Sequence, residues 1–264
     1  MRGLTDSVVD IGDRRLRTRT WGDPPASIVM LHHGLGSISQ FRDLPGRLHR
    51  ATGDTILAYD RAGHGNSLPT PSDEWPADWL HIEAGVLAAV LIAGGITRPL
   101  LVGHSDGASI ALIHAAGAGG SVAGLVALAP HSFVEDKAVA AIAALQSDPA
   151  QLLATLVEHH TEPVALFEAW TGAWLSDAFR DWDIRDRLGG ITAPALVLQG
   201  SRDAFASDEM LWSTVSAVGP RAEGRLLDGL GHDLPREEPT LLCELITAFN
   251  LLVATPGFDM PQDG

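Results

Sequence analysis

The sequence predicts an α/β protein in which helices cover both faces of a mostly parallel sheet. Short apolar runs bounded by glycine and proline alternate with helix-like stretches over the first 120 residues. The alternation then stops, and residues 131–190 show helical patterns only. Two more apolar runs and a long helical pattern complete the chain. We therefore expect one core domain, residues 1–130 and 191–264, with a helical cap at residues 131–190.

The first half of the chain is expected to supply six strands. Residues 8–20 predict a pair of strands joined at Gly12 and Asp13. Short apolar runs bounded by turn-forming residues are typical of buried parallel strands. Such runs occur at residues 28–32, 55–59, 100–102 and 122–128, and a helix is expected at residues 79–93.

The second half is expected to contain the cap and the last two strands. Pro149 and Pro163 separate the helical patterns of the cap. Helices are predicted at 135–145, 150–160 and 163–174, with a helical or turn segment at 177–188. Strands are predicted at 195–199 and 225–227, a final helix at 236–253, and a frayed tail after residue 255.

The amino-acid composition limits the kinds of partner that the protein can bind. The 264 residues are 45% hydrophobic and 19% charged, which suits a globular domain with a sizeable core. The net charge of −15 argues against nucleic acid and anionic membranes, because both need a basic patch. The N-terminus shows no apolar signal region, and the longest apolar run, 84–96, is too short to span a bilayer. We expect a cytoplasmic protein and leave its oligomeric state open.

The lone cysteine carries little functional information. With Cys243 as the only cysteine, no intrachain disulfide can form. It lies in the apolar run 241–246, which favours a buried structural thiol over a reactive one.

Residues 103–107 read Gly-His-Ser-Asp-Gly and carry the strongest chemical signal. The pattern G-x-S-x-G lies between an apolar run and a helical one, so Ser105 is expected on a sharp strand-to-helix turn. Such a turn strains the serine backbone, and side chains at Gly103 or Gly107 would clash with neighbouring elements. Five residues are a weak signal alone, so a serine nucleophile needs a base, an orienting group and oxyanion donors elsewhere.

His232 is the candidate base. It follows the last predicted strand and precedes the last helix, which is where the base of such a site should lie. The chain has ten other histidines, and an average histidine is a surface or a satisfied core residue. His159 and His160 are adjacent on a predicted helix and cannot share one face, so we expect no metal site there.

Asp203 is the candidate that orients His232. It lies just beyond the strand predicted at 195–199, at the same edge of the sheet. An aspartate in a solvated loop is the alternative interpretation. Asp228 and Asp233 are rivals, but both lie close to His232 along the chain.

Two backbone N–H groups are candidates for an oxyanion hole. The first is that of Asp106, at the expected start of a helix. The second is that of Leu35, in the loop at 33–36 that reads His-Gly-Leu-Gly. This loop does not match either glycine-rich motif that binds nucleotides. The phosphate-binding motif G-x-x-x-x-G-K-[ST] does not follow, and the third glycine of G-x-G-x-x-G is missing. The chemistry needs no metal and no organic cofactor.

Four separated motifs together resemble the α/β-hydrolase superfamily. They are residues 33–36, residues 60–67 (Asp-Arg-Ala-Gly-His-Gly-Asn-Ser), residues 103–107, and the pair Asp203 and His232 in the order nucleophile, acid, base. Within the superfamily the chain resembles small bacterial esterase-like hydrolases with a Ser-Asp-Gly elbow. The resemblance spans nearly the whole chain and implies the α/β-hydrolase fold, with an eight-stranded, mostly parallel sheet and a helical cap after the sixth strand. Ala108 is a departure, since many relatives have glycine there.

Substrate recognition is open to two interpretations. Asp106 could pair with a substrate ammonium, as in relatives that hydrolyse amino-acid esters, or could simply stabilise a helix N-terminus. Trp170 and Trp174 lie on one face of a predicted helix and would pack the cap or form an apolar wall for the substrate. His131, just past the sixth strand, is expected near the mouth of the pocket.

The predicted function is hydrolysis of a small carboxylic ester through an acyl-enzyme, with amides and thioesters as further candidates and with Asp106 favouring substrates that carry a free amine. The same three residues could instead support C–C bond hydrolysis, acyl transfer or cofactor-free perhydrolysis. A non-catalytic ligand-binding protein is the remaining alternative, disfavoured because the sequence retains every part of the machinery.

Overall fold

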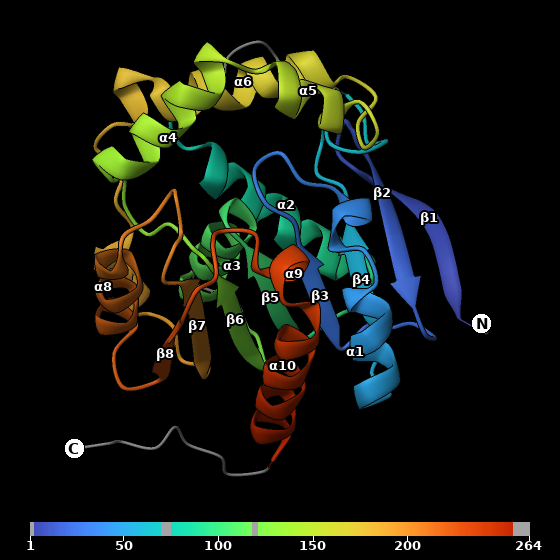
Figure 1. Ribbon diagram of the computed structural model, residues 1–264. Helices are drawn as coiled ribbons and strands as arrows, with labels where there is room; N and C mark the ends of the chain where they lie inside the picture. Colours follow the sequence, from blue (N-terminus) through green and yellow to red (C-terminus); the bar gives the residue numbers. More distant parts are fainter. Residues whose placement is uncertain (1–2, 70–74, 118–120, 256–264) are drawn as a thin grey trace.

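A computed structural model describes residues 3–69, 75–117 and 121–255, and its strands form one eight-stranded sheet (Figure 1). The strand order is β1-β2-β4-β3-β5-β6-β7-β8. β2 runs antiparallel to both of its neighbours, and the other adjacent strands are parallel. The mostly parallel sheet predicted from the sequence is confirmed. The strands are β1 (Leu4–Ile11), β2 (Arg14–Trp21), β3 (Ile28–Leu31), β4 (Ile56–Tyr59), β5 (Leu100–His104), β6 (Gly124–Leu128), β7 (Ala195–Gly200) and β8 (Ala222–Leu227).

The inner strands are buried on both faces. Every residue of β3, β5, β6 and β7 is buried, which explains their near-continuous apolar sequences. The edge hairpin differs. β1 is largely exposed and begins at Leu4, earlier than its sequence pattern predicts. The two strands turn at Gly12, whose φ of 61° suits glycine.

Helices cover both faces of the sheet (Figure 1). On one face α1 (Leu44–Thr52) packs against α10 (Pro239–Ala254), with short α9 (Leu234–Glu237) before it. On the other face lie α2 (Trp79–Ala93), α3 (Asp106–Ala116) and α8 (Asp208–Val218). α2 matches its predicted range, whereas the predicted final helix is two helices, with Pro239 opening the second.

Helices between β6 and β7 lie over one end of the sheet (Figure 1). They are α4 (Asp136–Ser147), α5 (Ala150–Leu156) and α6 (Pro163–Leu175), followed by the 3-10 turn η2 (Asp177–Phe179) and α7 (Arg185–Leu188). Residues 131–190 form no strand, only an isolated bridge between Phe133 and Asp183. α7 packs back against α3 and α8. That residues 131–190 form a separate cap domain stays a prediction.

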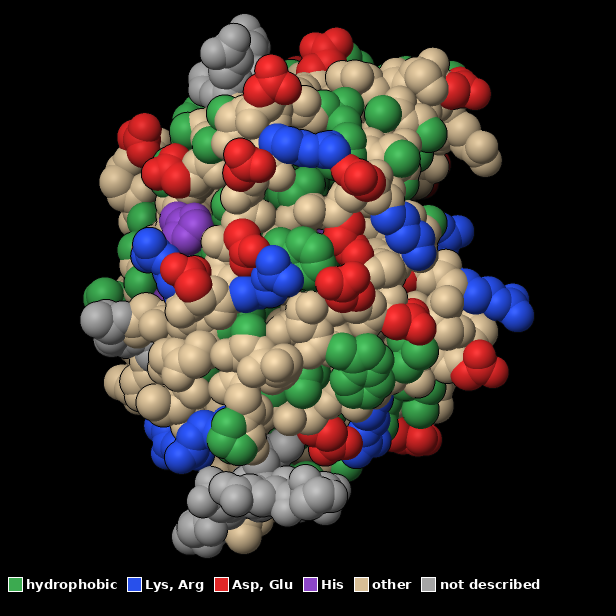
Figure 2. Space-filling model, turned by 90° about the vertical axis from the view of Figure 1, so that its left-hand side faces the viewer, with side chains coloured by type: hydrophobic (Ala, Val, Ile, Leu, Met, Phe, Trp, Pro, Cys, Tyr) green, Lys and Arg blue, Asp and Glu red, His purple; other side chains and the backbone are tan. Residues whose placement is uncertain are grey.

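The surface carries charges of both signs. Figure 2 views the face that includes α8, over which acidic and basic side chains are interspersed. In the residues that the structure describes, no helix is long and apolar enough to cross a membrane. Cys243 lies on α10 and is only half-buried, so it is less buried than we predicted from the sequence. The tail beyond residue 255 lies outside the described residues.

Candidate active site

Ser105 occupies the turn between β5 and α3 in a backbone conformation that non-glycine residues rarely adopt. Its φ is 53° and its ψ is −121°. A Cβ at Gly103 would overlap the backbone of Gly107 and Ala108, and one at Gly107 would overlap the carbonyl of Leu31 on the neighbouring strand. The glycines therefore allow the tight approach of strand and helix that holds the serine at this turn.

Three side chains from three separate loops form one hydrogen-bonded line. Ser105 Oγ lies 2.9 Å from His232 Nε2. On the other side of the ring, His232 Nδ1 lies 2.8 Å from Asp203 Oδ2 and 3.0 Å from its Oδ1. This arrangement suits an imidazole that donates from Nδ1 to the carboxylate and accepts the serine proton at Nε2.

The loops that carry Asp203 and His232 are fixed by close backbone contacts. Burial alone would raise the pKa of Asp203, but hydrogen bonds from His232 and from the Phe205 N–H hold the pKa below its usual value, so the carboxylate is ionised. His104 Nε2 lies 2.8 Å from the His232 carbonyl, and burial lowers the pKa of His104 to about 3, so this neutral ring donates to it. A Cβ at Gly200 would overlap the Leu230 carbonyl.

Side chains from two distant segments of the chain donate hydrogen bonds to the loop that carries Leu35. Arg61 Nη2 donates to the carbonyl of His33 at 2.8 Å. His160 accepts from the Gly65 N–H at Nδ1 and donates from Nε2 to the Leu35 carbonyl at 3.1 Å. Within the described part of the chain, the Leu35 N–H has no acceptor. It therefore stays available to an oxyanion, as does the N–H of Asp106 at the first position of α3.

Asp106 is fully buried beside Ser105, and its carboxylate faces helix α6. Its Oδ2 accepts a hydrogen bond from Trp170 Nε1 at 2.9 Å, and its Oδ1 has no hydrogen-bond partner. Burial raises the pKa of Asp106, while Arg61 and the indoles of Trp170 and Trp174 act in the opposite direction. The N–H of Trp174 does not reach hydrogen-bonding geometry.

A cavity of about 300 Å³ lies next to these groups, between the sheet and the helices α4, α5 and α6. Its cap wall is apolar and comes from three helices, and its polar rim includes Asp233 and Arg236. His131 is buried in this wall, with its ring 5.9 Å from that of His232. Burial lowers the pKa of His131 to about 3, so the ring is neutral. The cap wall consists of Ile142, Leu145, Leu152, Leu156, Trp170 and Trp174.

Seven of the eight candidate site residues from the sequence line this cavity and the eighth, Asp203, contacts His232, whereas the sequence analysis overlooked others. The eight are Leu35, Ser105, Asp106, His131, Trp170, Trp174, Asp203 and His232. Phe205 was overlooked, although its ring lies 4.7 Å from that of His232. His160 was expected on a helix, but α5 ends at Leu156 and His160 lies in the turn that follows. No sequence signal distinguished either residue.

Comparison with known proteins assigns the family. Residues 28–245 match the model of the "Alpha/beta hydrolase family". Because the match covers most of the chain, this protein belongs to the α/β hydrolase family. Among curated proteins, none matches the sequence.

Solved structures share the whole fold at low identity. A serine hydrolase from Cycloclasticus zankles matches with a TM-score of 0.79 and 20% identity, covering 94% of this chain and 98% of the other. Proline iminopeptidase from Mycobacterium smegmatis matches at 0.72 and 21%, covering 94% and 98%. A structure from a study of carboxylesterases of Nitrososphaera gargenis matches at 0.75 and 16%, covering 94% and 99%. At such identities these likenesses establish the fold alone.

Proposed function

We propose that this protein is a serine hydrolase that cleaves a small carboxylic ester through an acyl-enzyme intermediate. The observation that carries the proposal is the unbroken line from Ser105 Oγ through His232 to Asp203, with contacts of 2.9 and 2.8 Å. Amides and thioesters pass through the same tetrahedral intermediate and remain candidate substrates.

In the proposed mechanism, Ser105 Oγ attacks the acyl carbon while His232 Nε2 takes its proton. The oxyanion accepts hydrogen bonds from the N–H groups of Leu35 and Asp106. His232 returns its proton to the leaving alcohol, and the acyl group stays on the serine. A water molecule, deprotonated by His232, then attacks the acyl-enzyme; the bond between the acyl carbon and Ser105 Oγ breaks, His232 returns the proton to Oγ, and the acid is released. No step in this sequence calls for a metal or organic cofactor.

The cavity favours a short or medium acyl chain. Its volume of about 300 Å³ is at the lower end of small-molecule sites. Leucine, isoleucine and tryptophan side chains of the cap would contact the apolar part of the substrate, whereas Asp233 and Arg236 border the opening. We propose that residues 131–190 form a cap that limits the size of the substrate. A cytoplasmic location of the protein stays a prediction.

A preference for substrates with a free amine is a second element of the proposal. Asp106 lines the pocket and its buried Oδ1 has no hydrogen-bond partner, so a substrate ammonium that reached this oxygen would supply one. Asp106→Asn keeps an acceptor for Trp170 but removes the charge. It should reduce kcat/KM for an alanine ester much more than for the matching propionate ester. Asp233→Asn, at the rim of the same cavity, is the control, and equal losses on both esters would contradict amine recognition.

A substrate panel tests the proposed reaction. Wild type should hydrolyse p-nitrophenyl esters of acetate, butyrate and octanoate, with the shorter two preferred. Ser105→Ala should lose several powers of ten in kcat, while Ser39→Ala, which removes an exposed hydroxyl, should not. Turnover confined to a β-diketone, to acyl transfer between alcohols or to peracid formation would favour the other chemistries. A chain without turnover that still binds esters would favour the non-catalytic alternative.

A further inference from the structure

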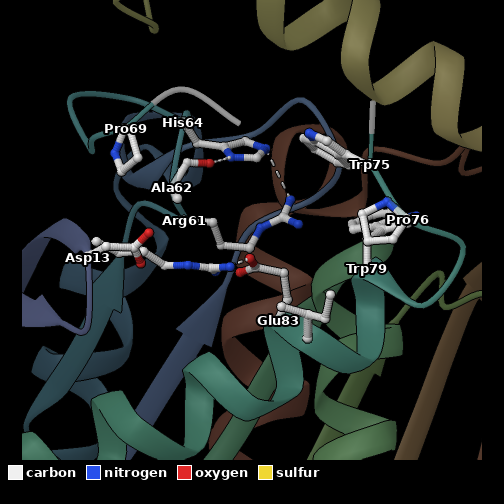
Figure 3. Close-up of a pocket in the computed structure, with 11 residues that line it drawn as sticks. Asp13, Arg61, Ala62, His64, Pro69, Trp75, Pro76, Trp79 and Glu83 are labelled. Atoms are coloured by element: carbon white, nitrogen blue, oxygen red, sulfur yellow. Dashed lines mark hydrogen bonds and ion pairs between the residues drawn. The ribbon is translucent and has the colours of Figure 1, made fainter. Parts of the chain in front are cut away.

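A second cavity, of about 280 Å³, lies apart from the catalytic pocket and shares no lining residue with it (Figure 3). Three segments build it: the turn between β1 and β2, the loop after β4, and the start of α2 with the residues before it. Pockets of this volume suit a small ligand. The residues that matter for its chemistry are Arg61, His64, Trp75, Trp79 and Glu83.

Arg61 is a buried cation that forms no ion pair with any residue that the structure describes. Its side chain lines the cavity and is only 2% exposed. The nitrogens Nε and Nη1 have no hydrogen-bond partner, and none of the ion pairs in residues 3–69, 75–117 and 121–255 includes it. In Figure 3 the guanidinium lies next to His64 and Trp79. Burying an unpaired charge is costly, so a group that supplies the missing negative charge would bind favourably.

The tryptophans beside Arg61 add both donors and apolar surface. The rings of Trp75 and Trp79 lie 4.8 Å apart, and their indole nitrogens are buried without acceptors. Pro69, Pro76 and Ile82 extend this apolar wall. The cavity therefore combines unpaired N–H donors with apolar surface that would contact a hydrocarbon body.

The acidic residues of the cavity restrict the charge of the ligand. Glu83 is already paired with Arg14 at 2.6 Å, and its second oxygen is unpaired. Asp13 also lines the cavity. Two carboxylates would repel a dianion such as a phosphate monoester, whereas a monoanion needs only the one free cation.

We infer that this cavity binds a small monocarboxylate with an apolar, ring-sized body. The carboxylate contacts Arg61, and the body lies against Trp75 and Trp79. The same guanidinium donates through Nη2 to His33, two residues before Leu35. If the proposed function holds, the bound acid therefore acts on the loop that supplies one oxyanion donor.

Calorimetric titration of the whole protein with benzoate tests the site without relying on turnover. Benzoate should bind, and benzamide, its neutral analogue, should not. Arg61→Gln should weaken benzoate binding roughly tenfold or more, because a charged hydrogen bond is lost. Glu83→Gln should tighten it, because a repelling charge is removed. Arg236→Gln, at the rim of the catalytic pocket, is the matched control and should leave the affinity unchanged.

Trp75→Leu provides a variant that leaves the Arg61 contact with His33 intact. It should weaken benzoate binding, while Trp212→Leu, a half-exposed residue of α8, should not. The inference fails if millimolar benzoate does not bind, if benzamide binds equally well, or if Arg236→Gln rather than Arg61→Gln abolishes binding. Because binding is read directly, an inactive protein that binds benzoate would contradict the proposed function and not the site.

Discussion

Asp106 Oδ2 accepts a hydrogen bond from Trp170 Nε1 at 2.9 Å, which ties the residue after Ser105 to cap helix α6. Both partners are buried, so the contact is worth more than an exposed one. A proposed oxyanion donor, the N–H of Asp106, therefore belongs to a residue whose side chain depends on where the cap lies. The position of α6 is therefore linked to one proposed oxyanion donor through this contact, and His160 links residues 131–190 to the loop of the other.

Gly34→Ala should disturb this contact. A Cβ there would overlap Trp170 Nε1 and lie 2.6 Å from Asp106 Oδ2, so the indole or the loop has to move. We expect a cost of about 1–3 kcal/mol in unfolding free energy, as for overpacked sites, and a lower kcat/KM. Gly172→Ala is the control, because it lies on the same cap helix with open space around it. Equal effects of the two variants on ester hydrolysis would show that Gly34 has no special role.

Trp170→Phe should leave Asp106 without its donor. Removing one partner of a buried hydrogen bond to a charged group costs about 1–3 kcal/mol, measured as a shift of the urea unfolding curve. Trp212→Phe, on the half-exposed surface of α8, should cost much less. In a double-mutant cycle with Asp106→Ala, which removes the acceptor, the two changes should be non-additive. Additive effects would mean that the contact contributes nothing to stability.

Asp203→Asn should lower kcat by roughly three to four powers of ten, because the amide no longer holds His232 in the required tautomer. The Phe205 and Ala206 N–H groups donate to the same carboxylate and restrict how the amide can turn. Asp228→Asn changes the exposed rival aspartate and should leave kcat nearly unchanged. The reverse ranking of the two variants would show that the acid was assigned to the wrong residue.

Acid should destabilise the fold through its buried histidines. Burial lowers the pKa of His104 and His131 to about 3 and that of His160 to about 4. The unfolded chain takes up these protons near pH 6.5, before the folded one can, so stability falls as the pH drops below 6.5. Burial lowers the pKa in the same direction for His32, His33 and His64.

The buried acid Asp60 opposes this trend. Burial raises the pKa of Asp60 to about 6, so its folded form keeps a proton that the unfolded form has lost, and stability falls as the pH rises from about 4 to 6. The histidines outnumber such acids, and urea unfolding at pH 7, 6 and 5 should show a net loss toward pH 5. His160→Asn should flatten the slope by up to about 1.4 kcal/mol per pH unit. A stability that rises toward pH 5 would contradict this balance.

The strands could be found from the sequence because each inner strand is a short apolar run bounded by glycine or proline. β1 was placed late because its exposed residues carry no pattern of burial. α1 and α8 were not singled out, since Pro45 and Gly46 interrupt the first and polar residues dilute the second. The final helix was predicted as one because its apolar pattern runs across the break at Glu238.

The candidate catalytic residues could be predicted from the sequence only where they directly follow a predicted strand. Ser105, Asp203 and His232 each follow a recognisable apolar run, so their meeting could be predicted from topology. His160 and Arg61 reach the loop of Leu35 by side-chain contacts between segments far apart in the chain. Such contacts depend on where loops fold in three dimensions and leave no periodic trace.

The intact mass of the protein after exposure to a fluorophosphonate tests the central claim most directly. Wild type should gain one adduct, and Ser105→Ala should gain none, because only a serine activated by His232 reacts with this reagent under mild conditions. The absence of an adduct on folded wild type, or an equal adduct on Ser105→Ala, would contradict the assignment of Ser105 as the nucleophile.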